Sequence, residues 1–106
     1  MIISTTENIA GYSIKEHLGT VIGNTIRARH VGKDIMAGLR TIIGGEIKEY
    51  TGMLAESREQ SMIRMKAKAK ELGADAVVGV RFQTSMILSG TAELLVYGTA
   101  VKLEKS

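Results

Sequence analysis

The strongest structural signal in this chain is a helical stripe of apolar and small residues between Glu46 and Leu72. Its members recur at helical spacing: Ile47, Tyr50, Leu54, Ser57, Ser61, Met65 and Leu72, with Ala69 beside the end. At about 1.5 Å per residue, the segment predicts a helix of about 40 Å. Acidic residues in its first turn and lysines in its last turns suit the helix dipole. Gly73 follows where a left-handed C-terminal cap is expected.

Alternating patterns on both sides of this helix predict strands. A short β-like stretch holds Ile2 and Ile3, and a long strand is expected from Ser13 to Arg29. The alternation in that strand places one set of residues on one face, Leu18, Thr20, Ile22, Asn24 and Ile26, and another on the opposite face, Val21, Gly23 and Thr25.

Two more strands are predicted after the cap. In the first, Ala76, Val78, Val80 and Phe82 alternate with Val77, Gly79 and Arg81. Residues 84–91 are expected to form a connection with a Ser89-Gly90 turn, and residues 92–103 to form the last strand.

A second, short helix is predicted between His30 and Gly45. Its apolar residues are Ile35, Met36, Leu39, Ile42 and Ile43, behind Asp34 as N-cap and before a stop at Gly44 and Gly45. The expected fold is therefore a single α+β domain over residues 1–106, in the order β-β-α-α-β-β. It comprises an antiparallel sheet with one short and one long helix.

The last strand is apolar on both faces, with Leu94, Val96 and Ala100 against Leu95, Tyr97 and Val101. An antiparallel sheet with helices on one side normally has a polar outer face. We therefore expect another copy of the chain to cover this surface in a closed homo-oligomer. Glycines within strands, at 19, 23, 79 and 98, are expected to mark bulges, bends or close backbone approaches.

Composition limits the class of protein. The chain has 106 residues, of which 44% are hydrophobic and 24% charged, as in an ordinary globular domain. No apolar run approaches the roughly 20 residues that a membrane span needs, so no membrane partner is expected. The N-terminal residues lack the pattern of a secretory signal and the chain has no cysteine, which favours a cytoplasmic location.

The net charge of +3 raises the possibility of a nucleic-acid partner. Aromatic residues make up only 4% of the chain, so platforms on which single-stranded bases could stack are scarce. We therefore do not expect a nucleic-acid partner. The alternative, an anion-binding surface, would use Arg27, Arg29, Lys66, Lys68 and Lys70.

No pattern in the sequence indicates catalysis. The chain has no cysteine nucleophile and no G-x-S-x-G element, so the protein is expected not to be an enzyme. Arg81 lies between apolar residues on a predicted strand, where a structural ion pair, for example with Glu93, is the simplest interpretation.

The sequence offers few residues that could bind a metal ion. A soft metal prefers thiolates, which are absent, and the only nitrogen ligands are His17 and His30. His30 and Asp34 are four residues apart and form the candidate metal pair. Asp34 is more simply explained as an N-cap and His30 as a loop residue. A ring of subunits could multiply the few ligands of each chain, whereas Met62 and Met65 fit a core-filling role.

Several motifs together resemble one family. They are Gly44-Gly45-Glu46, Tyr50, Arg58, the turn Gly73-Ala74-Asp75-Ala76, Gly79-Val80-Arg81 and Gly98-Thr99-Ala100. From about Thr20 to Val101, the chain resembles the YbjQ family of small bacterial proteins, which is described as heavy-metal-binding. The resemblance implies a subunit similar to that of dodecin, a pentameric ring, no established activity and a metal ion as the candidate cofactor. The family often has asparagine where this chain has Asp75, and either residue suits a turn.

Three interpretations follow. The first is a non-enzymatic homo-oligomer, a pentamer by resemblance, that binds a metal ion or small ligand. The second is a structural or stress-linked assembly without a ligand. The third is a weak binder of anions or nucleic acid. We expect the first, although the sequence identifies no residue that would bind a cofactor other than a metal.

Overall fold

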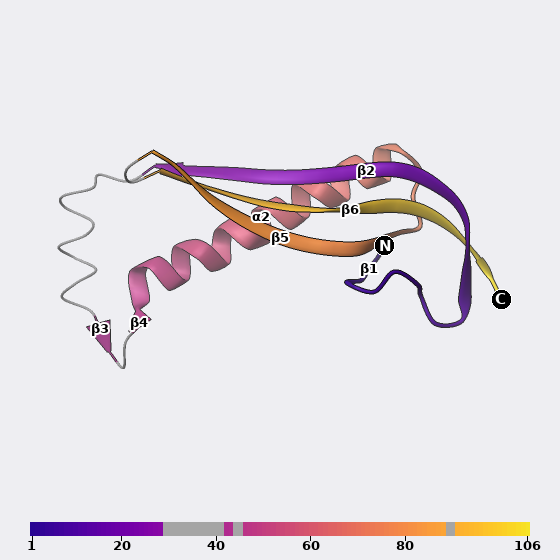
Figure 1. Cartoon of the computed structure of the whole chain (residues 1–106), viewed down its shortest axis with the longest axis horizontal. Coiled ribbons are helices and arrows are strands. Elements are labelled where there is room, and N and C mark those ends of the chain that lie inside the picture. The colour runs from indigo at the N-terminus through magenta and orange to yellow at the C-terminus, as the bar shows by residue number, and fades with distance from the viewer. Residues whose placement is uncertain (29–41, 44–45, 89–90) are drawn as a thin grey trace.

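The structure, a computed structural model, describes residues 1–28, 42–43, 46–88 and 91–106. Its main feature is a four-stranded sheet with a long helix across one face (Figure 1). Helix α2 spans Lys48–Glu71. The strands are β1 (Ile2–Ile3), β2 (Tyr12–Ala28), β3 (Ile42–Ile43), β4 (Glu46–Ile47), β5 (Ala76–Leu88) and β6 (Thr91–Lys105). The main sheet has the order β1-β5-β6-β2, and β3 pairs with β4 separately. The α+β class is confirmed.

The sheet is mixed. Strands β2 and β5 pair antiparallel with β6 between them, while β1 pairs parallel with β5 through Ile2 opposite Ala76 and Ile3 opposite Val77. The expectation of a purely antiparallel sheet is therefore wrong at this edge. Pairing β1 in parallel brings the N-terminal residues beside the strand that follows the helix.

The region before α2 differs from the prediction. Ile42 and Ile43 were expected in a short helix but pair as a strand with Ile47 and Glu46. Helix α2 consequently begins at Lys48 instead of Glu46. The β-branched isoleucines favour extended pairing, which explains the difference. The rest of the predicted short helix lies outside the described residues.

The predicted C-terminal cap of the long helix is confirmed. Gly73 has a φ of 78°, its amide donates to the Lys70 carbonyl, and the Ala74 amide donates to the Ala69 carbonyl. These two bonds form a Schellman motif, which satisfies carbonyls that the helix end would leave unpaired. Leu72, expected on the buried stripe, is 46% exposed because it follows the last helical residue.

Helix α2 buries the middle of its stripe against the sheet. Ser57, Ser61, Met65 and Ala69 are all buried. The core they contact contains sheet residues from three strands: Val21, Val77, Val80, Val96 and Ala100. The helix packs chiefly on β2 and β6 and barely reaches β5. The predicted core-filling role of Met65 is confirmed, and Met62 packs at the margin of this cluster.

At Gly23, the backbone of β2 lies directly against the backbone of α2. A Cβ at this position would overlap the Ser61 carbonyl oxygen and the Met65 amide nitrogen. Beside it, the Ser61 hydroxyl donates to the Leu94 carbonyl, which leaves the Thr25 hydroxyl to donate to Ser61 across 3.2 Å. The expectation of a helix lying tight on the sheet is confirmed, and it depends on small residues on both elements.

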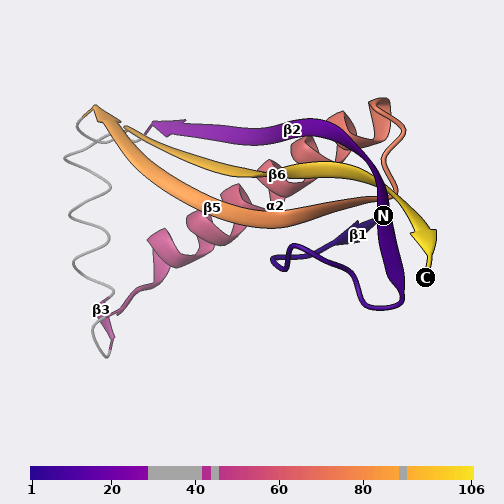
Figure 2. The ribbon, with the colours of Figure 1, turned by 45° about the vertical axis from the view of Figure 1, so that its right-hand side comes forward.

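We define the outer face as the face of the sheet turned away from α2. At one end it is covered by the chain between β1 and β2, where Ile9 packs with Ile14 and Leu103 against Ala76, Val78 and Val101. Figure 2 shows this connection crossing beneath the sheet before β2 begins. The rest of the outer face has no such cover within the described residues.

The alternation along β5 breaks at Gly79, whose φ is 63°. The register with β6 shifts between Val78 and Arg81, so Val78 lies on the outer face while Val80 joins the helix-side core. The prediction that both valines share a face is wrong for this reason. The strand also continues to Leu88, through residues expected to form a connection.

A similar shift explains the placement of Leu18 on β2. Its predicted face was that of Ile22, but Leu18 packs against the helix-side core. The register with β6 shifts between His17 and Gly19, which reverses the alternation there. Beyond the shift the prediction is confirmed, since Val21 and Thr25 are buried and Ile22 and Ile26 are exposed.

Substituting Gly23 tests the close approach of helix and strand. Gly23→Ala adds a Cβ that meets the helix backbone, which cannot move as a side chain can, so we expect a loss of about 1–3 kcal/mol in unfolding free energy. Gly52→Ala is the control, because a Cβ there meets nothing within 4 Å and should stabilise the helix by about 0.5–1 kcal/mol. Urea unfolding at one protein concentration measures both. Equal stability of Gly23→Ala and the parent chain would contradict the close approach.

Candidate functional site

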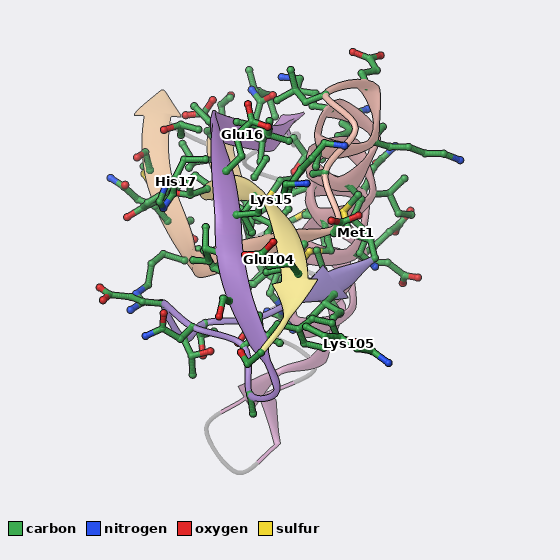
Figure 3. All side chains as sticks on the ribbon, turned by 90° about the vertical axis from the view of Figure 1, so that its right-hand side faces the viewer. Met1, Lys15, Glu16, His17, Glu104 and Lys105 are labelled. Atoms are coloured by element: carbon green, nitrogen blue, oxygen red, sulfur yellow. The ribbon has the colours of Figure 1, made fainter. Side chains whose placement is uncertain are left out.

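The residues predicted as a metal pair, His30 and Asp34, lie outside the described residues, as do Gly44 and Gly45. The pair therefore stays a prediction. His17, the other histidine, is exposed on β2. Figure 3 shows it on the side of the strand away from α2, with Lys15 on the opposite side.

Irregularities of the sheet gather around His17. Strand β2 has register shifts between Ile14 and Glu16 and between His17 and Gly19. The shift in β5 at Gly79 lies nearby, and a further shift, at the other end of β5, lies apart from them. Bulges bend a strand, strengthen its twist and re-aim side chains, and they are enriched beside functional sites. Figure 1 shows the resulting sharp bend of β2 near its beginning.

The inside of this bend is an open hollow of about 820 Å³. Its walls come from the connection between β1 and β2 and from the first residues of β2, and its base comes from β5 and β6. The lining residues are Glu7, Asn8, Tyr12, Ser13, Ile14, His17, Val78, Gly79 and Thr99. We call this site the hollow, and it is open to solvent and has room for a small molecule.

Backbone hydrogen bonds hold the wall of the hollow on β5. The Gly79 amide donates to the Thr6 carbonyl at 2.9 Å, and the Val80 amide donates to the Ser4 carbonyl at 3.0 Å. The Thr6 hydroxyl in turn donates to the Asn8 carbonyl at 2.6 Å. The segment carrying Glu7 and Asn8 is thus tied to the bulge, so the bulge shapes the hollow and also anchors its wall.

Arg81 completes this attachment. Its Nη1 donates to the Thr5 carbonyl at 2.9 Å and to the Val80 carbonyl at 2.8 Å. The predicted pairing with Glu93 is wrong, because the register sets Ser85 opposite Glu93 and Tyr97 opposite Arg81. The Glu93 carboxylate instead accepts a hydrogen bond from the side-chain Nδ2 of Asn24 at 3.1 Å. Arg81 therefore serves the fold by holding the N-terminal segment.

The hollow offers a poor set of ligands for a heavy metal. It contributes one imidazole, His17, and one carboxylate, Glu7, whereas zinc sites use three or four protein ligands. The sequence has no cysteine to supply a soft thiolate. Within the part of the chain that the structure describes, no three His, Asp or Glu residues are grouped to hold an ion. The residues of a single described chain do not fit such a metal.

The basic residues considered for anion binding have a structural explanation. Lys66, Lys68 and Lys70 are exposed, and the last two lie in the final turn of α2. Positive charge is stabilising at a helix C-terminus. The side chains of Arg27 and Arg29 lie outside the described part.

A second candidate surface is the uncovered part of the outer face. Ile26 is 58% exposed, Ile22 43% and Tyr97 36%. The register places Ile22 beside Tyr97, and Leu95 lies beside Asn24. On β2 and β6 the apolar members of this surface adjoin the base of the hollow, since Thr99 follows Tyr97 on the same face of β6. On the neighbouring strand β5, the register sets Arg81 opposite Tyr97 and Gln83 opposite Leu95.

The chain belongs to the YbjQ family, since the family model described as "Putative heavy-metal-binding" matches residues 1–104. It is 56% identical to a UPF0145 protein of Colwellia psychrerythraea over 99% of this chain and all of that one. A UPF0145 protein of Archaeoglobus fulgidus is 59% identical over 97% of this chain and 95% of its own. Relatives therefore include archaeal proteins, so the expectation of a bacterial family was too narrow.

A solved structure supports the fold. A protein of unknown function of the DUF74 family from Pediococcus pentosaceus superimposes with a TM-score of 0.71 at 20% identity, over 98% of both chains. Identity at this level supports the fold alone. Within the described residues, no helix has the length and apolar character to cross a membrane.

Sequence reasoning missed most of the hollow. Glu7, Asn8 and Tyr12 belong to no motif, and Thr99 belongs to one that the sequence did not connect with a site, because the lining comes from separate segments that only the bend brings together. A signal was nevertheless present in Gly19 and Gly79, which were expected to mark bulges or bends. Both have positive φ values and both lie at register shifts, so this prediction is confirmed.

Substituting Gly79 tests the bulge that supports the hollow. A Cβ at Gly79 meets nothing within 4 Å, so Gly79→Ala is disfavoured only by the left-handed backbone, at about 1–2 kcal/mol. Gly79→Asn should lose less, because asparagine tolerates this conformation. We expect the alanine variant to lower the unfolding free energy and shift the amide resonances of Thr6 and His17. Shifts of the Met65 and Ala69 resonances in the alanine variant would instead show that Gly79 contacts the helix side.

Proposed function

We propose that the protein is a non-enzymatic homo-oligomer whose copies assemble through the uncovered outer face and whose hollow binds a small ligand. The main observation that supports the proposed assembly is the extended shape of the chain. Its radius of gyration is 17.2 Å, with extents of 54 × 26 × 16 Å, whereas a compact domain of this length has a radius of about 13 Å. A chain so extended leaves much of its apolar surface unburied.

The exposed apolar residues support the same proposal. Besides Ile22, Ile26 and Tyr97 on the outer face, Phe82 is 46% exposed and Met86 77% exposed on β5. The register sets Phe82 opposite Val96, so it lies on the helix side but beyond the reach of α2. Apolar surface of this kind on both sides of one sheet is typical of an interaction site.

The sheet edges add a further reason. Among the residues that the structure describes, β2 pairs with β6 on one side only, and β5 pairs with β1 at two residues. Unpaired strand edges readily accept another strand, and proteins usually cover or protect them. Association with neighbouring copies would cover these edges.

The number of five copies rests on the resemblance to the family, and a cytoplasmic location rests on the absence of cysteine.

The ligand of the hollow is the second part of the proposal. Bulges beside a concave surface of this volume, lined by hydroxyl, amide, imidazole and carboxylate groups, are the features of a small-molecule site. A metal ion is the alternative that the family description suggests. Since one chain supplies too few ligands in its described part, such an ion would need His17 or His30 from several copies.

An outer-face substitution tests the assembly. Ile22→Lys places a charge within the proposed interface, so we expect the oligomer to dissociate and the mass measured by light scattering to fall to that of one chain. Ile63→Lys is the matched control, because Ile63 is equally apolar and 58% exposed but lies on α2. An Ile22→Lys protein that keeps the parent mass while Ile63→Lys dissociates would place the interface on the helix instead.

Native mass spectrometry before and after dialysis against a chelator separates the remaining alternatives. We expect a mass of five chains, unchanged by the chelator, with small molecules accounting for any excess mass. Removal of one metal mass per ring by the chelator would support an ion shared between copies. The mass of a single chain at micromolar concentration would contradict the proposed assembly.

A further inference from the structure

The lining of the hollow carries a negative charge. Among its nine lining residues, Glu7 supplies the only carboxylate, and no lysine or arginine is present. The nearest cation along β5, Arg81, directs Nη1 to the carbonyls of Thr5 and Val80. Among the lining residues, the fixed charge is therefore negative. An anionic ligand would face Glu7 without a cation among the lining residues to balance it.

The uncharged residues of the lining also favour one kind of ligand. Ile14 and Val78 are apolar members of the lining, and Tyr12, which also lines the hollow, is 38% exposed. An aromatic face attracts an ammonium or guanidinium group, and aliphatic side chains accommodate methylene groups. The side-chain oxygens of Asn8 and Thr99 and the imidazole of His17 add hydrogen-bond acceptors. Together these groups suit a ligand with a charged nitrogen on a short carbon chain.

The size of the hollow also favours an organic ligand over a metal ion. A metal ion is held by ligands about 2–2.6 Å from its centre, so it needs only a small convergent cluster. The hollow, of about 820 Å³, is open and has room for an organic molecule, and no three of its His, Asp or Glu residues are grouped to hold an ion. The class of ligand thus differs from the one in the family description.

We propose that the hollow binds a small organic cation, an amine or guanidinium compound with a short methylene chain. Its charged nitrogen contacts the Glu7 carboxylate and the Tyr12 ring, and its methylene groups lie over Ile14 and Val78. This inference rests on the proposed function of the hollow and names its ligand class. It involves no covalent step.

Titration of the intact protein with agmatine, followed by NMR and calorimetry, tests the proposal. Agmatine carries a guanidinium and an amine joined by methylene groups, and glutarate serves as an anion of comparable length. We expect agmatine to bind with submillimolar affinity and to shift the resonances of Tyr12, His17 and Thr99. Glutarate should not bind.

Variants assign the binding to named groups. Glu7→Gln should weaken agmatine binding about tenfold or more, since it removes a charged hydrogen-bond partner. Glu59→Gln is the matched control, because Glu59 is exposed on α2 and away from the hollow. Tyr12→Phe should keep the affinity while Tyr12→Leu should weaken it severalfold, because only the ring face is required.

The outcomes separate the two proposals. Absence of agmatine binding, or equal binding by Glu7→Gln, overturns the assignment of an organic cation. If glutarate or a zinc ion moves the Tyr12, His17 and Thr99 resonances instead, the hollow remains a binding site and only the ligand class is wrong. If none of these probes moves the resonances, the ligand-binding part of the proposed function fails together with this inference.

Discussion

The contact between Gly23 and the backbone of α2 determines the rest of the arrangement. Because the helix backbone rests on β2 at Ser61 and Met65, α2 is held over β2 and β6 and cannot shift toward β5. Strands of 13 to 17 residues then extend beyond what a single long helix can cover. Within the described residues, the helix side of β5 and the part of the outer face beyond the Ile9 cluster are therefore left uncovered. The proposed association would follow from this packing of the core.

The hollow arises from departures from regular pairing. Each bulge inserts an extra residue into one strand, which bends β2 and turns β5 at Gly79. Regular strands would continue flat past this point and offer no concave surface. The chain that closes the hollow is bonded to the bulge and packs Ile9 into the outer-face cluster. The wall of the hollow is therefore attached to the sheet by backbone hydrogen bonds and by apolar packing.

Much of the fold could be predicted from the sequence, because periodicity reports which face of an element is buried. The long helix, its cap at Gly73, and the two faces of β6 all follow from residue spacing and glycine placement. The placements of Leu18 and Val80 could not be predicted, because a bulge reverses alternation without changing composition. The continuation of β5 through Thr84 was missed because polar residues there resemble a turn. Its partner strand stabilises it, which is a tertiary effect.

The candidate site was less predictable than the fold for a related reason. Its chemical groups come from the N-terminal connection, β2, β5 and β6, and each is unremarkable within its own segment. The hollow also opens on the outer face, where Thr99 and Val78 continue into the apolar surface around Tyr97 and Ile22. A neighbouring copy seated on that surface would lie at the rim of the hollow. Ligand binding and assembly would then stabilise each other, because whatever binds only the assembled state shifts the equilibrium toward it.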